Sequence, residues 1–157
     1  MSDEPTAAIR IRKYAPHDWD AVCAIYDIAK PDELRDSGDL RAIRPLREDE
    51  AMQALFHDSA VLVGEVHDEV VAFAGTKGNY VSWLFVHPDY RRRGLGGLLL
   101  REVMAPLRGA VELNVAKNNQ PARALYERAG FKTAKEFVGE WNGYECHVAR
   151  LRYEAAV

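Results

Sequence analysis

The sequence predicts an α/β (α+β) fold in which a mixed central β-sheet is flanked by helices. Some segments alternate apolar and polar residues as strands do, and others repeat apolar residues at three- and four-residue spacing as helices do. Their order, βααβββαβαββ, places helices between strands in the middle of the chain and a strand pair at its end. The length of 157 residues fits a single domain over residues 1–157.

The first part of the chain predicts one strand and two helices. Residues 8–14 alternate apolar and basic side chains, which is typical of a half-buried strand. A helix is expected from Pro16 to Pro31, because its apolar residues follow helical spacing and proline ends many helices. Residues 32–46 are polar and charged, so they predict an irregular connection before a helix over residues 47–57.

The remaining elements are separated by clear turn signals. His67-Asp-Glu and Asn142-Gly are typical hairpin turns, and Gly130 follows a helix where a left-handed residue is favoured. The predicted strands cover residues 59–66, 70–76, 80–86, 110–116, 131–141 and 144–153. One predicted helix begins at residue 94 and ends before Pro106, and another runs from residue 119 to Ala129.

Composition excludes several classes of protein. The net charge of −3 argues against a nucleic-acid partner, and no apolar run approaches the ~20 residues of a membrane helix. The N-terminus has no apolar signal segment, so we expect the cytoplasm. Cys23 and Cys146 form neither a disulfide framework nor a zinc spacing, so no metal is predicted.

An anion site is predicted between the strand over residues 80–86 and the next helix. A helix N-terminus presents unpaired N–H groups to phosphate, and glycines let an anion approach the backbone closely. A basic turn with a glycine-rich helix start is the alternative. The loop consists of Arg91, Arg92, Arg93, Gly94, Leu95, Gly96 and Gly97.

A second candidate group lies on the helix after residue 118. Asn119 and Tyr126 are seven residues apart and share one helix face. The phenol of Tyr126 could donate a proton to a leaving group. A packed aromatic ring with its hydroxyl at the surface is the alternative.

Together the two groups resemble a known family. The pattern Val86-x-Pro88-x-x-Arg91-x-x-Gly94-x-Gly96, followed by Asn119-x-x-Ala122-x-x-x-Tyr126-x-x-x-Gly130-Phe131, resembles the GCN5-related N-acetyltransferase family. The resemblance implies acetyl-CoA as acyl donor and a sheet that splays beside the strand over residues 80–86. It implies that Tyr126 is the general acid that protonates the departing CoA thiolate. The implied donor-binding residues are Leu84, Phe85, Val86, Arg91, Arg92, Arg93, Gly94, Leu95, Gly96, Gly97, Asn119 and Tyr126.

The base and the acceptor site are less well defined. Some family members carry a Glu where this chain has Asn114, and an amide cannot act as a base. The base therefore stays unassigned: the candidates are Glu65, Glu112, Tyr80, His147, Asp27 and Glu33, and a water chain to bulk solvent or an amine already partly neutral would also serve. The candidate acceptor-binding residues are Asp27, Glu33, Trp83, Asn114 and Trp141.

The predicted function is transfer of an acetyl group to a primary amine of a small molecule or peptide. A non-catalytic acyl-CoA-binding or sensing module is the alternative, because the Glu is missing at Asn114. An RNA- or protein-modifying acetyltransferase is less favoured. Neither nucleic acid nor a membrane is expected as partner, and the sequence leaves a homodimer open.

Overall fold

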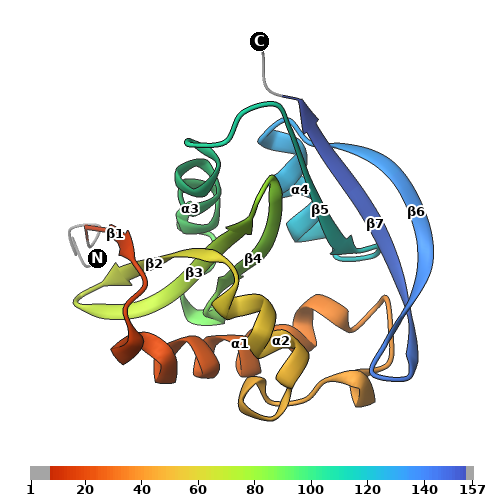
Figure 1. Cartoon of the computed structure of the whole chain (residues 1–157), viewed down its shortest axis with the longest axis horizontal. Helices are drawn as coiled ribbons and strands as arrows, with labels where there is room; N and C mark the ends of the chain where they lie inside the picture. Colours follow the sequence, from red (N-terminus) through yellow and green to blue (C-terminus); the bar gives the residue numbers. More distant parts are fainter. Residues whose placement is uncertain (1–7, 155–157) are drawn as a thin grey trace, which may run out of the picture.

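The computed structural model describes residues 8–154 and has the predicted order of strands and helices around one sheet (Figure 1). Short 3-10 turns join some of the elements. In chain order the strands and α-helices are β1 (Arg10–Lys13), α1 (Trp19–Leu34), α2 (Glu50–His57), β2 (Ala60–Val66), β3 (Glu69–Lys77), β4 (Tyr80–Val86), α3 (Leu95–Met104), β5 (Ala110–Ala116), α4 (Gln120–Arg128), β6 (Lys132–Trp141) and β7 (Tyr144–Glu154).

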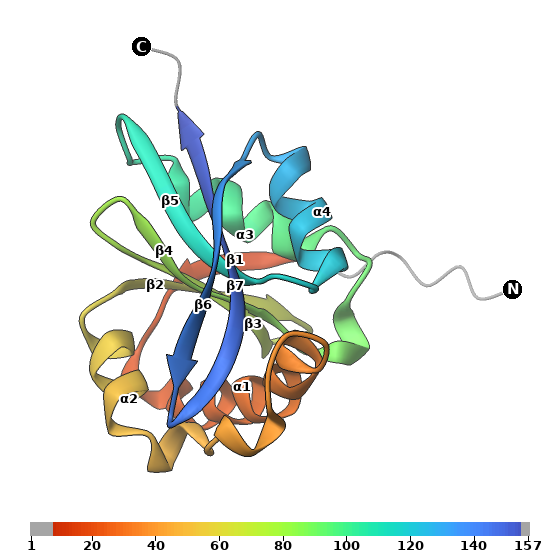
Figure 2. The same cartoon turned by 90° about the vertical axis from the view of Figure 1, so that its right-hand side faces the viewer.

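The sheet has the strand order β1-β2-β3-β4-β5-β7-β6 and is antiparallel except between β4 and β5. These two parallel strands share a single pair of partners, Tyr80 and Glu112. Beyond that pair they diverge, and β5 leans away from β4 in the side view (Figure 2). The mixed, splayed sheet is therefore confirmed.

Helices cover both faces of the sheet (Figure 2). On one face, α1 and α2 pack on a core that contains Trp83 and Phe85 of β4. On the other face, α3 packs on β2 and β3, and α4 packs on β5 and β7. Leu84 belongs to this second side, so Trp83 and Leu84 point to opposite faces, as their alternation predicts.

A β-bulge in β4 lies just before the point where the sheet opens. Thr76 pairs with Val81 and Gly75 with Trp83, so Ser82 is an extra residue without a partner in β3. Its hydroxyl shares a hydrogen bond of 2.8 Å with the Ser59 hydroxyl. A bulge bends a strand and increases its twist, which helps β4 turn away from β5.

The predicted end of the first helix is wrong. α1 continues through Pro31 to Leu34. Proline lacks the N–H for one helical hydrogen bond, but Arg35 N–H donates to the Pro31 carbonyl at 3.0 Å. Leu34 is 3% exposed, so its burial stabilises the extra turn. The helix predicted from residue 47 begins instead at Glu50, behind a 3-10 turn at Leu46–Glu48.

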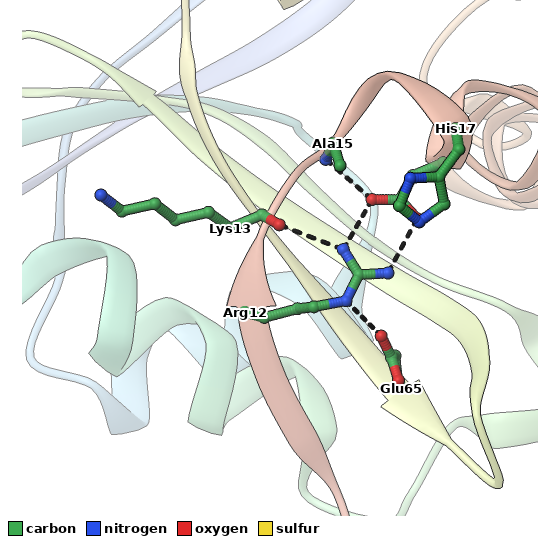
Figure 3. A network of polar contacts seen from close by, with 6 residues as sticks. Arg12, Lys13, Ala15, His17 and Glu65 are labelled. Carbon is green, nitrogen blue, oxygen red and sulfur yellow. Dashed lines mark hydrogen bonds and ion pairs between the residues drawn. The ribbon is translucent and has the colours of Figure 1, made fainter.

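A buried ionic network holds β1 to β2 and to the start of α1 (Figure 3). The Arg12 guanidinium donates to both carboxylate oxygens of Asp18, at 2.7 and 2.8 Å, and to Glu65. The Ala15 N–H also donates to Asp18 at 2.8 Å. The Asp18 side chain is only 2% exposed and that of Glu65 9%. Glu65 is therefore the ion-pair partner of Arg12 on β2, and β3 separates this strand from the splayed strands β4 and β5.

We expect Arg12→Met to lower the free energy of unfolding by about 3 kcal/mol at pH 7, because it leaves two buried carboxylates without their cation. The arginine holds the pKa of Asp18 below its ordinary value of 3.8. A lowered folded-state pKa contributes stability above pH ~4 and loses it as pH falls through the folded value. The deficit of the variant should therefore shrink at pH 3, as urea titrations can measure.

Arg152→Met is the matched control for this substitution. Arg152 also contacts two carboxylates, Glu112 at 3.9 Å and Glu154 at 3.1 Å, but its side chain is 45% exposed. Exposed ion pairs contribute little, so the control should cost about 0.5 kcal/mol. Equal losses in the two variants would contradict the role assigned to burial.

Candidate active site

A cleft of about 1770 Å³ lies where β4 and β5 diverge. Its walls come from α1, α3, α4, the loop before α3 and the β6–β7 hairpin. The structure brings all twelve predicted donor-binding residues to this one cleft. Four of the five predicted acceptor-binding residues, Glu33, Trp83, Asn114 and Trp141, also line it.

The inner edge of β4 is open in this cleft. Leu84, Phe85 and Val86 pair with β3 through Ala74, Phe73 and Ala72. On the other side, β4 pairs with β5 only at Tyr80. The backbone groups of Leu84–Val86 that point toward β5 are therefore free to bind an extended ligand as a further strand would.

The loop at one end of the cleft has the geometry of an anion cradle. Within residues 8–154, the six consecutive N–H groups from Arg92 to Gly97 donate to no protein group. Gly94 caps α3 in the left-handed conformation, with φ of 77°. The N-terminal end of the helix dipole adds positive potential at the same place. The cradle therefore suits a phosphate or diphosphate.

The three arginines of the loop differ in their contacts. Arg91 donates to Asp32 of α1 at 2.9 Å, which fixes the loop to that helix. Its guanidinium, with that of Arg35, holds the pKa of Asp32 below the usual range. The Arg93 guanidinium stacks 5.0 Å from the Tyr90 ring centroid. Arg92 is exposed and forms no ion pair among the described residues.

The opposite wall carries Asn119 and Tyr126 of the α4 region. The side-chain oxygen Oδ1 of Asn119 accepts from Ala122 N–H at 3.4 Å and caps the helix, so the side-chain amide N–H groups of Asn119 remain free to donate. The Tyr126 ring packs edge-on against Phe131, with centroids 5.8 Å apart. Tyr126 is 8% exposed, and its burial raises the pKa of the phenol far above 10, with a smaller contribution from the negative charge of Glu33. The phenol is therefore protonated at any physiological pH.

One end of the cleft, where the predicted acceptor-binding residues Glu33 and Trp141 lie, is formed by α1 and the β6–β7 hairpin. Glu33 pairs there with Lys30 at 3.1 Å, and the Lys30 ammonium lies 4.7 Å from the Trp141 ring centroid. The sequence prediction missed Lys30, although its (i, i+3) spacing to Glu33 was a signal. Asn114 accepts from Arg150 Nε at 3.0 Å, so its amide is already oriented.

One predicted acceptor-binding residue lies elsewhere. Asp27 does not line the cleft, and its carboxylate accepts the Leu46 N–H at 2.9 Å. It therefore ties α1 to the segment before α2. Trp83 reaches the cleft only from the core, where it is 1% exposed.

The structure also narrows the candidates for the base. Of the six residues considered, only Tyr80 and Glu33 line the cleft. Burial raises the pKa of Tyr80, which makes it a poor base near neutral pH. Within residues 8–154 no three His, Cys, Asp or Glu side chains are grouped to hold a metal ion. None of the described helices is long and apolar enough to span a membrane.

Comparisons with known proteins agree with this geometry. A family model described as the acetyltransferase (GNAT) family matches residues 19–131. The uncharacterized N-acetyltransferase YafP of Escherichia coli K12 is 30% identical over 138 residues, which cover 86% of this chain and 89% of YafP.

Solved structures of other acetyltransferases share the fold. A GCN5-related N-acetyltransferase from Rhodopseudomonas palustris has a TM-score of 0.81 and 21% identity, and covers 95% of this chain and 97% of its own. The PaiA N-acetyltransferase from Thermoplasma acidophilum, solved with coenzyme A, has a TM-score of 0.78 and 17% identity. The match covers 94% of this chain and 99% of the PaiA chain.

Proposed function

The chain belongs to the acetyltransferase (GNAT) family and is an acetyl-CoA-dependent acyltransferase, and we propose that it transfers the acetyl group to a primary amine in the cleft between β4 and β5. One observation carries the proposal: the free edge of β4 connects an anion cradle to a buried, protonated phenol. The crystallised relative with coenzyme A supports CoA as the donor's carrier.

The donor-binding residues fit the parts of acetyl-CoA. The N–H groups from Arg92 to Gly97 would bind the pyrophosphate, and Arg92 and Arg93 would add charge. The open edge at Leu84–Val86 and the free amide of Asn119 would hold the pantetheine arm. A backbone N–H of that edge would also donate to the thioester carbonyl as negative charge develops on its oxygen.

The chemistry is direct aminolysis of the thioester. The acceptor ammonium first loses one proton, and its nitrogen then attacks the carbonyl carbon. The C–N bond forms, the C–S bond breaks, and the leaving thiolate takes a proton from Tyr126. The second proton of the attacking nitrogen restores the phenol, so the products are the amide, CoA thiol and one released proton.

The test is release of CoA thiol from acetyl-CoA across a panel of primary amines. We expect release that depends on one class of amine and saturates with its concentration. Calorimetry with CoA, run in parallel, reports donor binding without turnover. A protein that binds acetyl-CoA but releases no thiol with any amine would instead support the non-catalytic module.

The cytoplasm is the proposed location, because Cys23 and Cys146 are both free thiols, as a reducing compartment favours. The proposed acceptor is a primary amine of a small molecule or of a peptide.

A further inference from the structure

The acceptor end of the cleft contains a partly buried ion pair. Lys30 and Glu33 lie on adjacent turns of α1, with Nζ and Oε1 3.1 Å apart. Their side chains are only 14% and 26% exposed. Both residues line the cleft that contains Tyr126 and the free edge of β4. The pair therefore faces the place where an amine must enter.

The surroundings of Lys30 are mainly aromatic. Its ammonium lies 4.7 Å from the ring centroid of Trp141, 5.8 Å from that of Phe85 and 6.0 Å from that of Tyr26. Rings attract a cation, but a charge in such a setting loses much of its hydration. An apolar residue would fill this wall at lower cost. Two charges placed in such a wall therefore point to a ligand that carries charges of its own.

Other charged groups near this end are already occupied or lie at the rim. Asp32 accepts from Arg91 at 2.9 Å and from Arg35 at 2.8 Å. Asp36 and Glu140 are exposed, so water and salt screen them. Within residues 8–154, Oε2 of Glu33 has no ionic partner. The pocket thus presents the Lys30 ammonium beside the Glu33 carboxylate, which has one oxygen without an ionic partner among the described residues.

We infer, on the basis of the proposed function, that the acceptor is a small zwitterionic amine: an α-amino acid or a close analogue with an apolar side chain. Its carboxylate binds the Lys30 ammonium, and its amino group binds Glu33. The aromatic rings of Phe85 and Trp141 contact its side chain. A dication such as a diamine meets the like charge of Lys30 and is disfavoured.

The closed outer wall of the pocket favours a small acceptor over a peptide. The β6–β7 hairpin reaches down to the α1–α2 region (Figure 2). There the Asn142 amide donates to the Ala42 carbonyl at 2.7 Å. His147 N–H donates to the Ser37 carbonyl at 2.7 Å, and Gly38 forms a β-bridge with Cys146. A peptide chain would need to break these contacts to lie across the pocket.

The same arrangement gives the first proton a path. The ammonium of the acceptor passes one proton to Glu33, which releases it to water. The neutral nitrogen then forms the C–N bond while the C–S bond of the donor breaks; Tyr126 protonates the CoA thiolate, and the second proton of the nitrogen restores the phenol. Glu33 is thereby both the binding partner of the amine and its base.

The experiment compares four matched acceptors: L-phenylalanine, L-phenylalaninamide, phenethylamine and cadaverine. We expect kcat/KM for L-phenylalanine to exceed that of the other three at least tenfold. Lys30→Met should lower kcat/KM for L-phenylalanine at least tenfold and change that for phenethylamine less than threefold. Lys30→Arg should retain the preference. Lys117→Met, which removes a lysine paired with Glu136 at 3.2 Å outside the cleft, is the matched control.

Binding separates this inference from the proposed function. Calorimetric titration of L-phenylalanine and phenethylamine into the complex with CoA should show the same preference without turnover. If phenethylamine or cadaverine is the better acceptor or ligand, or if Lys30→Met leaves the preference unchanged, the inference is overturned while acetyl transfer stands. If the amino acid binds as expected but nothing is acetylated, the proposed function fails instead.

Discussion

Tyr126→Phe is expected to lower kcat about 100-fold with little change in the affinity for CoA, because it removes the proposed proton donor and keeps the ring. The ring packs on Phe131 with centroids 5.8 Å apart, and phenylalanine retains that contact. Stopped assays of thiol release measure kcat, and calorimetry measures CoA affinity. Tyr14→Phe is the matched control, because Tyr14 packs edge-on against Phe56 away from the cleft.

The raised pKa of Tyr126 constrains how the phenol acts. The CoA thiol has a pKa near that of cysteine, about 8.5. Proton transfer to its thiolate from a phenol whose pKa lies far above 10 is therefore unfavourable in free energy. The step becomes favourable when the phenol regains the second proton of the attacking nitrogen at the same time. In the proposed mechanism Tyr126 would therefore relay a proton and would not become a free phenolate.

The relay gives the prediction a pH signature. The loss of kcat in Tyr126→Phe should be the same at pH 7 and at pH 9, because the phenol does not ionise in that range. A loss that disappears at pH 9 would indicate an ionising phenol and contradict the relay. An unchanged kcat at both values would show that Tyr126 only packs.

The fold was predictable because its signals are local. Strand and helix periodicity, the Asn142-Gly143 turn and the glycines before α3 are each contained in a few neighbouring residues. The wrong helix end at Pro31 arose because its decisive contact is not local. Leu34 is buried against the rest of the molecule, and that burial outweighs the missing hydrogen bond.

The proposed donor and acceptor ends of the site also differ in whether their sequence signals are local. The cradle depends on backbone N–H groups and glycines, which are evident in the sequence. Asp27 and Glu33 of α1 look alike in sequence, but Asp27 accepts the Leu46 N–H while Glu33 lines the cleft. The position of Lys30 in the cleft could not be predicted, because its neighbour Trp141 lies 111 positions later along the chain. In the structure the Trp141 ring centroid is 4.7 Å from the Lys30 ammonium.

The glycines of the loop can be distinguished only in the structure. Gly96 and Gly97 both lie in the first turn of α3, where a carboxylate would block the cradle. A Cβ at Gly96 would lie 3.1 Å from Leu125 Cδ1, so a larger residue would also disturb the packing of α3 on α4. A Cβ at Gly97 meets no atom within 4 Å. Gly97 is therefore the cleaner position for the test.

Gly97→Glu is expected to weaken acetyl-CoA binding about 100-fold, or ~3 kcal/mol, because it brings a negative charge to the site proposed for the pyrophosphate. Gly97→Gln has nearly the same shape without the charge and should weaken binding less than tenfold. Calorimetric titration with acetyl-CoA measures both. Equal losses would indicate steric blocking, and unchanged affinity in both would place the pyrophosphate elsewhere.

Stability should move in the opposite direction from binding. Gly97 is the third residue of α3, where glutamate has better helix propensity than glycine by about 0.5–1 kcal/mol and interacts favourably with the helix dipole. The melting temperature of Gly97→Glu without ligand should therefore equal or exceed that of the wild type. A variant that is more stable alone but binds its donor poorly cannot have lost binding through misfolding, so its defect would lie in the charge of the cradle.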